Sequence, residues 1–265
     1  MGKICHLAEY GTLSSSLGPG EEPLCLALET ATATASVALL RGERVLAVEQ
    51  SPDGQHHSET LLPMIDGILS AGGYRLEAID LFAVSIGPGA FTSLRIGLAT
   101  LKGLAFGSAR PAVAVSTLQA LALTACRALP ELGPGMLVPT LDARRGEVYA
   151  AAYSLAELTG DLGALKPWVA ESVYGPGELA RALPEGGTLV GEGARVVAPE
   201  LVTGEPGGWR VENASPGVPD AVAVGLLGLA GAAQGRGCPA GDLVPRYVRR
   251  AEAEVTRTAQ RLEPN

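Results

Sequence analysis

The stretch "LCLALETATATASVALLRGERVLAVEQ", residues 24–50, holds three short apolar runs separated by polar residues that favour turns. The first run, at 24–30, has the nearly continuous hydrophobicity of a buried strand. The two runs that follow predict a hairpin that turns between Arg41 and Arg44. Three strands in succession therefore predict a sheet at the start of the globular part of the chain.

Helices and strands alternate after these three strands. The expected elements are, in order, a helix at 57–73, a strand at 79–86, a helix at 92–107, a strand at 111–116 and a helix at 116–129. Gly72 and Gly73 end the first of these helices, and Ser116 is a suitable N-cap for the last. These elements define an N-terminal subdomain at 24–130.

The second half of the chain repeats this order more loosely. We expect strands at 136–143, 146–154, 168–174 and 188–193, and helices at 176–183, 194–201 and 219–236. The run at 207–214 is a poor candidate for the missing strand between the last two helices. A second subdomain is therefore expected at 131–250, followed by a tail at 251–265. Before the first subdomain, residues 1–23 are expected to be a disordered extension.

Mixed-sheet units of this order, used twice, resemble the actin-like ATPase architecture that sugar kinases, the Hsp70 ATPase domain and actin share. The predicted fold class is therefore α/β, an actin-like ATPase (ribonuclease H-like) fold with two duplicated mixed-sheet subdomains. This likeness concerns the fold alone, because such architectures host many unrelated functions.

Composition excludes several classes of protein. The net charge of −8 and the pI near 5.0 argue against unaided binding of RNA or DNA, which needs clustered basic residues. The longest apolar run, at 221–233, is too short to span a bilayer, so no membrane association is expected. The four cysteines lie far apart, which favours reduced thiols in a cytoplasmic protein over a disulfide framework or a zinc clamp.

Neither a nucleotide site nor a metal site is predicted. A phosphate-binding hairpin needs glycine where the backbone approaches the phosphates, but the loop "ETATATAS" that starts at Glu29 has none. The equivalent loop of the second half has one glycine, Gly146, and two arginines. The three histidines include no His-x-x-x-His pair, and His57 with Glu59 is typical of a solvated first helical turn. We therefore expect no catalytic, cofactor-binding or metal-ligating residue.

Three further motifs resemble, in order and spacing, the bacterial TsaB family, also called YeaZ. They are "GPGAFTSLRIG" at 87–97, "DARRGEVY" at 142–149 and "PRYVR" at 245–249. The resemblance covers residues 24 to about 250. It departs from the family at Glu29, where aspartate is usual, and at Ala90 and Ser93, where serine and glycine are common. These departures weaken a ligand role for the loops and leave a partner role standing.

The resemblance implies a noncatalytic subunit in the threonylcarbamoylation of N6 of adenosine 37, in tRNAs that read codons beginning with A. In that family the catalytic paralogue, TsaD, binds its metal through a His-x-x-x-His motif, at a position that here reads "VSTLQALA" without histidine. The implied partners are a TsaD-like catalytic subunit and a TsaE-like ATPase, with tRNA held mainly through the partner. TsaC supplies the threonylcarbamoyl adenylate substrate.

Two helices have the composition of a docking surface. Ala99, Gly103 and Gly107 recur every four residues, so they form a shallow row on which another helix can pack closely. The preceding helix has only Glu59 and Asp66 as charged residues, which is too apolar for a helix with one wet face. The expected partner contacts are Leu61, Leu62, Ile65, Ile68, Leu69, Arg95, Ala99, Gly103 and Gly107.

Other interpretations stay open from the residues alone. Both helices are equally consistent with packing inside one domain, and the family resemblance favours docking, as a heterodimer or a homodimer. An ATP-dependent kinase-like enzyme and a metallopeptidase are the alternative functions. Pro63 predicts a kink in the first helix or a later start. Arg95 can bridge to a carboxylate of the partner or of its own domain, and the basic groups that could touch tRNA or an acidic partner are Arg144, Arg145, Arg246, Arg249 and Arg250.

Overall fold

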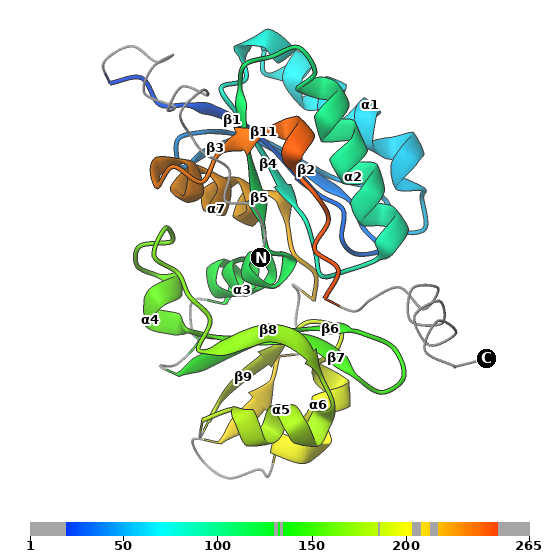
Figure 1. Ribbon diagram of the computed structural model, residues 1–265, viewed down its shortest axis with the longest axis vertical. Coiled ribbons are helices and arrows are strands. Elements are labelled where there is room, and N and C mark those ends of the chain that lie inside the picture. Colours follow the sequence, from blue (N-terminus) through cyan, green and yellow to red (C-terminus); the bar gives the residue numbers. More distant parts are fainter. Residues whose placement is uncertain are drawn as a thin grey trace, which may run out of the picture.

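The computed structural model describes residues 20–129, 132, 135–184, 186–202, 208–212 and 217–248. Two lobes lie one above the other, each built on a mixed sheet (Figure 1). Most of the predicted extension at 1–23 and the whole predicted tail at 251–265 lie outside the described residues.

The sheet of the upper lobe has the strand order β11-β5-β4-β1-β2-β3. Its strands are β1 (Leu24–Glu29), β2 (Ser36–Arg41), β3 (Arg44–Gln50), β4 (Leu81–Ser85), β5 (Pro111–Val115) and β11 (Cys238–Pro239). Strands β1, β4 and β5 are parallel, while β2 pairs antiparallel with β1 and β3. The structure thus contains the predicted hairpin of residues 24–50 and the later strands in one mixed sheet.

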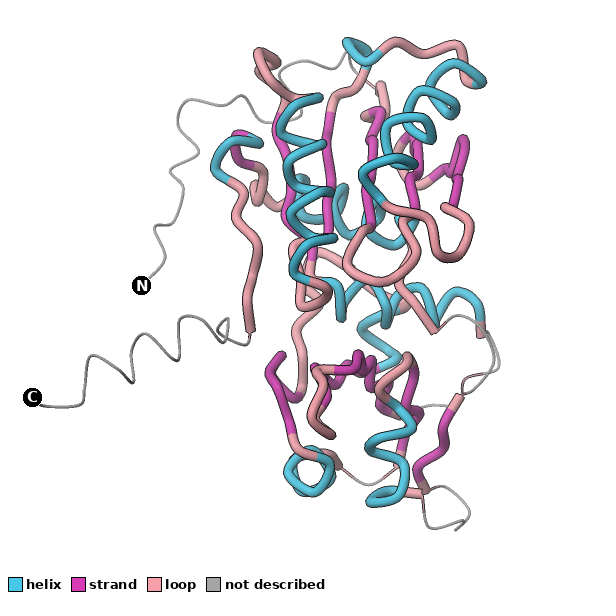
Figure 2. Tube along the Cα trace, turned by 90° about the vertical axis from the view of Figure 1, so that its right-hand side faces the viewer, coloured by secondary structure: helices cyan, strands magenta, loops and turns pink. Residues whose placement is uncertain are grey.

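Helices cover both faces of this sheet. On one face lie α1 (His57–Ala71) and α2 (Phe91–Leu104), which Figure 2 shows side by side in front of the strands. On the other face lie α3 (Thr117–Ala128) and α7 (Ala221–Ala233). Because successive side chains of a strand point to opposite faces, Leu26 and Leu28 face α1 and α2, whereas Cys25 and Ala27 face α7.

The sheet of the lower lobe repeats the order of the upper one. Its strands, ordered β10-β9-β6-β7-β8, are β6 (Met136–Asp142), β7 (Val148–Ser154), β8 (Val169–Tyr174), β9 (Gly187–Val190) and β10 (Trp209–Val211). The pairing is antiparallel from β6 through β7 to β8 and parallel from β6 through β9 to β10. The predicted actin-like fold with two duplicated sheets is confirmed. The prediction that the run at 207–214 is a poor candidate for a strand was wrong, since β10 forms within it.

Short helices complete both lobes. They are α4 (Leu155–Leu158), α5 (Pro176–Ala182) and α6 (Ala194–Leu201) in the lower lobe, and the 3-10 turns η2 (Leu76–Ala78) and η3 (Ala240–Asp242) in the upper one. None of the helices in the described part of the chain is long and apolar enough to cross a bilayer.

The chain returns to the upper lobe after β10, which differs from the predicted subdomain boundaries. Helix α7 packs on β1, β2 and β4, and β11 adds to the edge of β5. A Cβ added at Gly228 would lie 2.5 Å from the Cβ of Ala83, so glycine lets α7 approach the sheet closely. Residues 221–248 therefore belong with the upper lobe and not with the predicted subdomain at 131–250.

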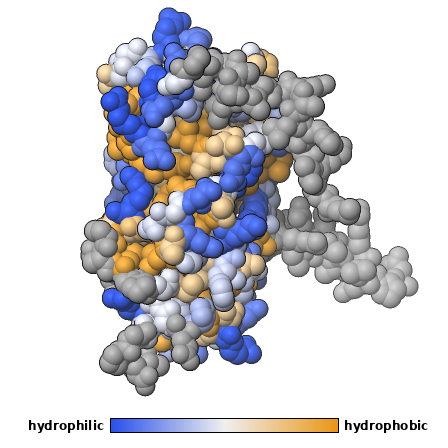
Figure 3. Space-filling view, turned by 90° about the vertical axis from the view of Figure 1, so that its left-hand side faces the viewer, coloured by the Kyte–Doolittle hydropathy of each residue, from blue (hydrophilic) through white to orange (hydrophobic). Residues whose placement is uncertain are grey.

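The side of the molecule on which α7 lies is hollowed, and both apolar and charged residues line the hollow. A groove of about 1490 Å³ is lined by Leu226 and Leu229 of α7, by Leu123 of α3 and by Leu158 and Leu162 of the lower lobe. Figure 3 shows apolar surface gathered over the middle of this side of the molecule. The groove lies across the sheet from α1 and α2, away from the predicted docking residues.

Candidate functional site

The outward face of α2 is a row of small residues that stays open. Arg95, Ala99 and Gly103 are exposed, while Leu94, Leu98 and Leu101 on the opposite side of the helix are buried against the sheet. A Cβ added at Gly103 would meet no atom within 4 Å. A second helix can therefore approach this face closely without displacing any described side chain.

The row is shorter than the sequence suggested. Helix α2 ends at Leu104, so Gly107 lies beyond the helix, where its φ of +75° is one that glycine adopts easily. The helix also starts at Phe91, one residue before the predicted start. The described row therefore consists of Ala99 and Gly103, with Arg95 one turn before them.

Four of the predicted partner contacts on α1 face the protein's own core. They are Leu61, Ile65, Ile68 and Leu69, all of which pack with the strands of the upper lobe. Leu62 is the exception, with 54% of its surface exposed. The helix begins at His57 and runs through Pro63, so the later start suggested for it is wrong. Only Leu62 among these five leucines and isoleucines is available to a partner.

A stacked cluster flanks the first turn of α2. The guanidinium of Arg95 lies 3.8 Å from the centroid of the Phe91 ring, and its Nε donates a hydrogen bond of 2.9 Å to the hydroxyl of Tyr247. The rings of Phe91 and Tyr247 stack with centroids 4.9 Å apart. We call Phe91, Arg95 and Tyr247 the aromatic platform. The platform could not be predicted from the sequence, because Tyr247 lies 152 residues after Arg95.

Tyr247 belongs to a segment that runs down the upper lobe toward the lower one. This segment, residues 243–248, follows η3, and we call it the C-terminal strap (Figure 2). The N–H of Arg246 donates a hydrogen bond of 2.7 Å to the carbonyl of Ile86. A Cβ at Gly87, whose φ is +114°, would lie 2.8 Å from the carbonyl oxygen of Arg246. The "GPG" turn thus needs glycine where the strap crosses it.

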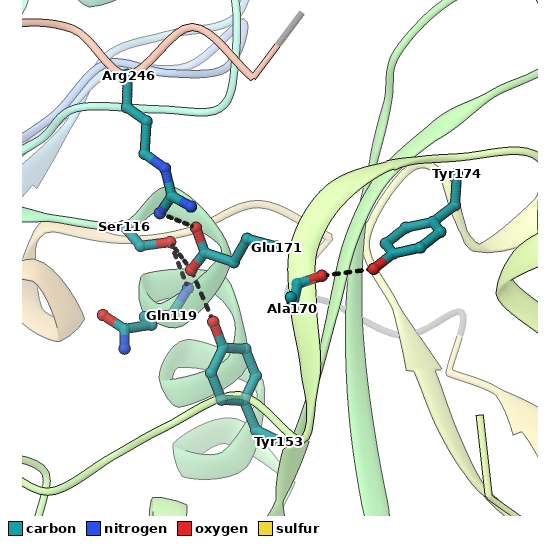
Figure 4. Close-up of polar contacts among 7 residues, drawn as sticks. All are labelled: Ser116, Gln119, Tyr153, Ala170, Glu171, Tyr174 and Arg246. Atoms are coloured by element: carbon teal, nitrogen blue, oxygen red, sulfur yellow. Dashed lines mark hydrogen bonds and ion pairs between the residues drawn. The ribbon is translucent and has the colours of Figure 1, made fainter. Parts of the chain in front are cut away.

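The strap also joins the two lobes through one carboxylate. Glu171 of β8, whose side chain is 5% exposed, forms an ion pair with Arg246 (Figure 4). It also accepts hydrogen bonds from the hydroxyls of Ser116 and Tyr153. Ser116 is the N-cap of α3, as predicted, because its Oγ accepts from the N–H of Gln119. These four residues, Ser116, Tyr153, Glu171 and Arg246, form the inter-lobe cluster.

The phenol of Tyr153 is held in its neutral form by this environment. Burial raises its pKa well above the usual value, and the nearby negative charge of Glu171 raises it further. A neutral phenol donates its hydrogen to Glu171, so the carboxylate has three donors around it. The cluster is a satisfied structural contact between the lobes.

The loop after β1, in which the sequence offers no glycine for a phosphate, makes hydrogen bonds within the protein itself. Glu29 is fully buried, and its Oε1 accepts a hydrogen bond from the N–H of Ala31. Burial raises the pKa of Glu29 to about 7. The loop after β1 is fastened to the start of α2, because the carbonyl of Ala31 accepts a 2.8 Å hydrogen bond from the N–H of Ala90.

The comparisons with known proteins agree on one lineage. The family model "TsaD: tRNA N6-adenosine threonylcarbamoyltransferase" matches residues 51–192. A protein of Haemophilus influenzae named tRNA threonylcarbamoyladenosine biosynthesis protein TsaB is 38% identical over 57% of this chain and 64% of its own length. Its namesake from Escherichia coli is 41% identical over 50% of this chain and 55% of its own length. The chain thus spans between half and two thirds of these curated relatives.

Solved structures extend the likeness to nearly the whole fold. The structure named YeaZ from Pseudomonas aeruginosa is 33% identical, with a TM-score of 0.68, and the match covers 85% of this chain and 99% of that one. A second Pseudomonas aeruginosa structure, described as similar to peptidase YEAZ, gives 33% identity and a TM-score of 0.69, with 86% and 100% covered. The chain belongs to the TsaB (YeaZ) family.

Two of the TsaB-family motifs come together in the fold. The "GPG" turn after β4 and the "PRYVR" motif, of which residues 245–248 are described, meet where the strap crosses the turn. The third motif forms the β6–β7 hairpin, where Arg144 and Arg145 adopt positive φ and Arg144 pairs with Asp142. The first two motifs therefore shape the upper lobe, and Arg246 of the second links it to the lower one.

The remaining predicted groups have structural partners or lie outside the description. Arg246 is engaged by Glu171, and Arg249 and Arg250 fall outside the described residues. His57 is buried and its Nε2 lies 2.9 Å from the carbonyl oxygen of Thr32, so the prediction of a solvated first turn was wrong for it. Within the described residues, no group of three or more His, Cys, Asp or Glu side chains is placed to hold a metal ion.

Proposed function

We propose that this chain is a noncatalytic subunit that binds a TsaD-like catalytic protein and supports threonylcarbamoylation of N6 of adenosine 37. The substrates are tRNAs that read ANN codons, held mainly by the partner, and a TsaE-like ATPase completes the assembly in the cytoplasm. The names of the TsaB relatives and the match to the TsaD family model support the pathway. The observation that carries the docking role is the open face of α2 at Ala99 and Gly103.

The docking face has the shape that helix packing needs. Small residues at spacing four let two helix axes come close, and an exposed Leu62 on the neighbouring helix adds apolar area. A second copy of this chain is the competing occupant of the same face. A homodimer and a heterodimer would then exclude each other.

The loops argue for a binding role over a chemical one. The loop between Glu29 and Ser36 has no glycine, which a phosphate-binding turn needs, and its Ala31 is hydrogen-bonded to Ala90 at the start of α2. The segment "VSTLQALA" offers no histidine for a metal. These features disfavour the kinase-like and metallopeptidase alternatives.

The test is light scattering after size-exclusion chromatography of this chain mixed with the TsaD-like protein of the same organism. ATP binding to the chain alone is measured in parallel by calorimetry. A one-to-one complex without ATP binding supports the proposal. Tight ATP binding without a complex would instead support an ATP-dependent kinase-like enzyme.

Gly103→Arg localises the complex to α2. Its side chain would stand on the open face and should abolish the heterodimer without unfolding the chain. Gly177→Arg is the matched control, because Gly177 on α5 of the lower lobe also has no atom within 4 Å of an added Cβ. Equal binding by both variants would place the interface elsewhere.

A further inference from the structure

Arg95 is an oriented cation with bonding capacity left over. Its ring contact with Phe91 and its hydrogen bond to Tyr247 fix the plane of the guanidinium. The hydrogen bond uses only Nε–H, so the N–H groups on the two Nη atoms remain available to an acceptor. A guanidinium held in this way loses little side-chain freedom when a ligand binds.

No carboxylate of the chain itself engages this cation within the described residues. The ion pairs there include Arg75 with Glu77, Arg110 with Asp80, Arg127 with Asp220, Arg144 with Asp142 and Arg246 with Glu171. Of the two bridges that the sequence left open for Arg95, the one within its own domain is therefore absent from this part of the chain. The side chain is exposed and faces outward beside the open row of α2.

The surroundings of Arg95 suit a protein partner better than a nucleic acid. Ala99 and Gly103 follow it on the same helix face, and Val244 of the strap is 68% exposed. The nearest basic groups of the strap and helix are occupied, because Arg246 pairs with Glu171 and Lys102 donates to the carbonyl of Gly241. A single arginine beside aromatic and apolar surface is typical of protein hot spots, whereas phosphate backbones need several cations.

The strap keeps the platform in place. Tyr247 directly follows Arg246, whose backbone is bonded to Ile86 and whose side chain is bonded to Glu171. The hydroxyl of Tyr247 is therefore positioned before any partner arrives. Tyr247 acts as a positioning residue for Arg95.

We propose that the aromatic platform of Phe91, Arg95 and Tyr247 binds an Asp or Glu side chain of the docked TsaD-like protein through the free edge of the Arg95 guanidinium. The inference rests on the proposed function and adds to it the chemistry of the partner's contact. The carboxylate anchors one end of the interface, and the small residues of α2 accept the partner's helix beside it.

Binding of the TsaD-like protein to matched variants tests the role of the charge. Arg95→Gln should raise the Kd roughly tenfold or more and flatten its salt dependence, and Tyr247→Phe should raise the Kd by a smaller factor. Arg195→Gln, which removes the same charge from the exposed side of α6 in the lower lobe, should bind like the unchanged chain. If the unchanged chain forms no complex, the proposed function fails. If it does and Arg95→Gln binds equally well, only the platform inference is overturned.

Zero-length crosslinking identifies the acceptor. Arg95→Lys places a primary amine at this position, and a carbodiimide then joins it only to a carboxyl group in direct contact. Mass spectrometry of the crosslinked complex should show a bond from position 95 to an Asp or Glu of the partner, and none from Arg195→Lys. An Arg95→Gln variant that keeps its partner affinity but lowers the affinity of the complex for tRNA would assign the platform to RNA and overturn the inference.

Discussion

The guanidinium of Arg246 in the C-terminal strap pairs with the carboxylate of Glu171 in β8, so a segment fastened to the upper lobe holds a strand of the lower lobe. Ser116 and Tyr153 donate to the same carboxylate from α3 and β7. One nearly buried acidic side chain thus joins the two lobes, beside the apolar contact of α3 with the lower sheet. Since the strap also carries Tyr247, the same contact supports the platform on α2.

Glu171→Gln should destabilise the protein by roughly 1–3 kcal/mol, because the amide cannot accept charge-assisted hydrogen bonds from the three donors equally well. Urea unfolding followed by tryptophan fluorescence measures the free energy of unfolding. Glu77→Gln is the control, since Glu77 and Arg75 form an ion pair that is largely exposed and should contribute little to the free energy of unfolding. Equal losses in the two variants would show that the inter-lobe cluster adds nothing beyond a surface contact.

The burial of Glu29 predicts a pH-dependent stability. The folded-state pKa is raised from 4.5 to about 7, so between these values the folded chain holds a proton that the unfolded chain has released. The free energy of unfolding should therefore fall as pH rises from about 4.5 to about 7 and change little above that. The part due to Glu29 is on the order of 3 kcal/mol.

Glu29→Gln isolates this contribution. The amide keeps an oxygen that can accept from Ala31 and stays neutral at every pH. The difference in unfolding free energy between the variant and the unchanged chain should move in favour of the variant as pH rises from 4.5 to 7. A difference that stays constant from pH 4 to pH 8 would contradict a raised pKa at Glu29.

The order of the elements could be predicted from the sequence because it depends on local patterns. Apolar runs and turn residues predicted every strand of the upper sheet except β11, and Ser116 predicted the start of α3. The repeat of the order in the second half gave the fold class. Strand β10 was not predicted because it has only three residues, of which only Trp209 is buried, so its apolar pattern is weak.

The candidate site depended on contacts that no local pattern contains. Helix α1 is apolar on much of its surface, and only its packing on the sheet decides that Leu61 is buried and Leu62 exposed. The partners Arg95 and Tyr247 are separated by 152 residues, and Arg246 and Glu171 by 75. Helix α7 has no charged residue, which demands burial but does not say against which lobe, so its return to the upper sheet could not be predicted.

Two glycines of α2 should respond in opposite ways to the same substitution. Gly97→Ala should cost roughly 1–3 kcal/mol, because the added Cβ would overlap the fully buried side chain of Thr30. Gly103→Ala should instead stabilise the isolated chain by up to about 1 kcal/mol, since alanine favours helix and the site is open. Thermal unfolding of both variants measures the effects. Destabilisation by Gly103→Ala would mean that the face of α2 is covered in the isolated chain.

Adjacent leucines on α1 separate stability from docking. Leu61 is 1% exposed, so Leu61→Ala should cost about 2–5 kcal/mol through the cavity it leaves. Leu62 is 54% exposed, so Leu62→Glu should change the free energy of unfolding by about 0.5 kcal/mol or less.

Binding should show the reverse order. Leu62→Glu places a charge on the face proposed to meet the TsaD-like protein and should weaken the complex roughly tenfold or more, as measured by calorimetry. Leu61→Ala, assayed at a temperature where it remains folded, should bind with nearly unchanged affinity, because the side chain points into the upper lobe. Both residues are leucines of one helix, so this crossed result would follow from their opposite orientations. If Leu62→Glu binds normally while Gly103→Arg does not, the partner contacts α2 alone, and α1 serves only to cover the sheet.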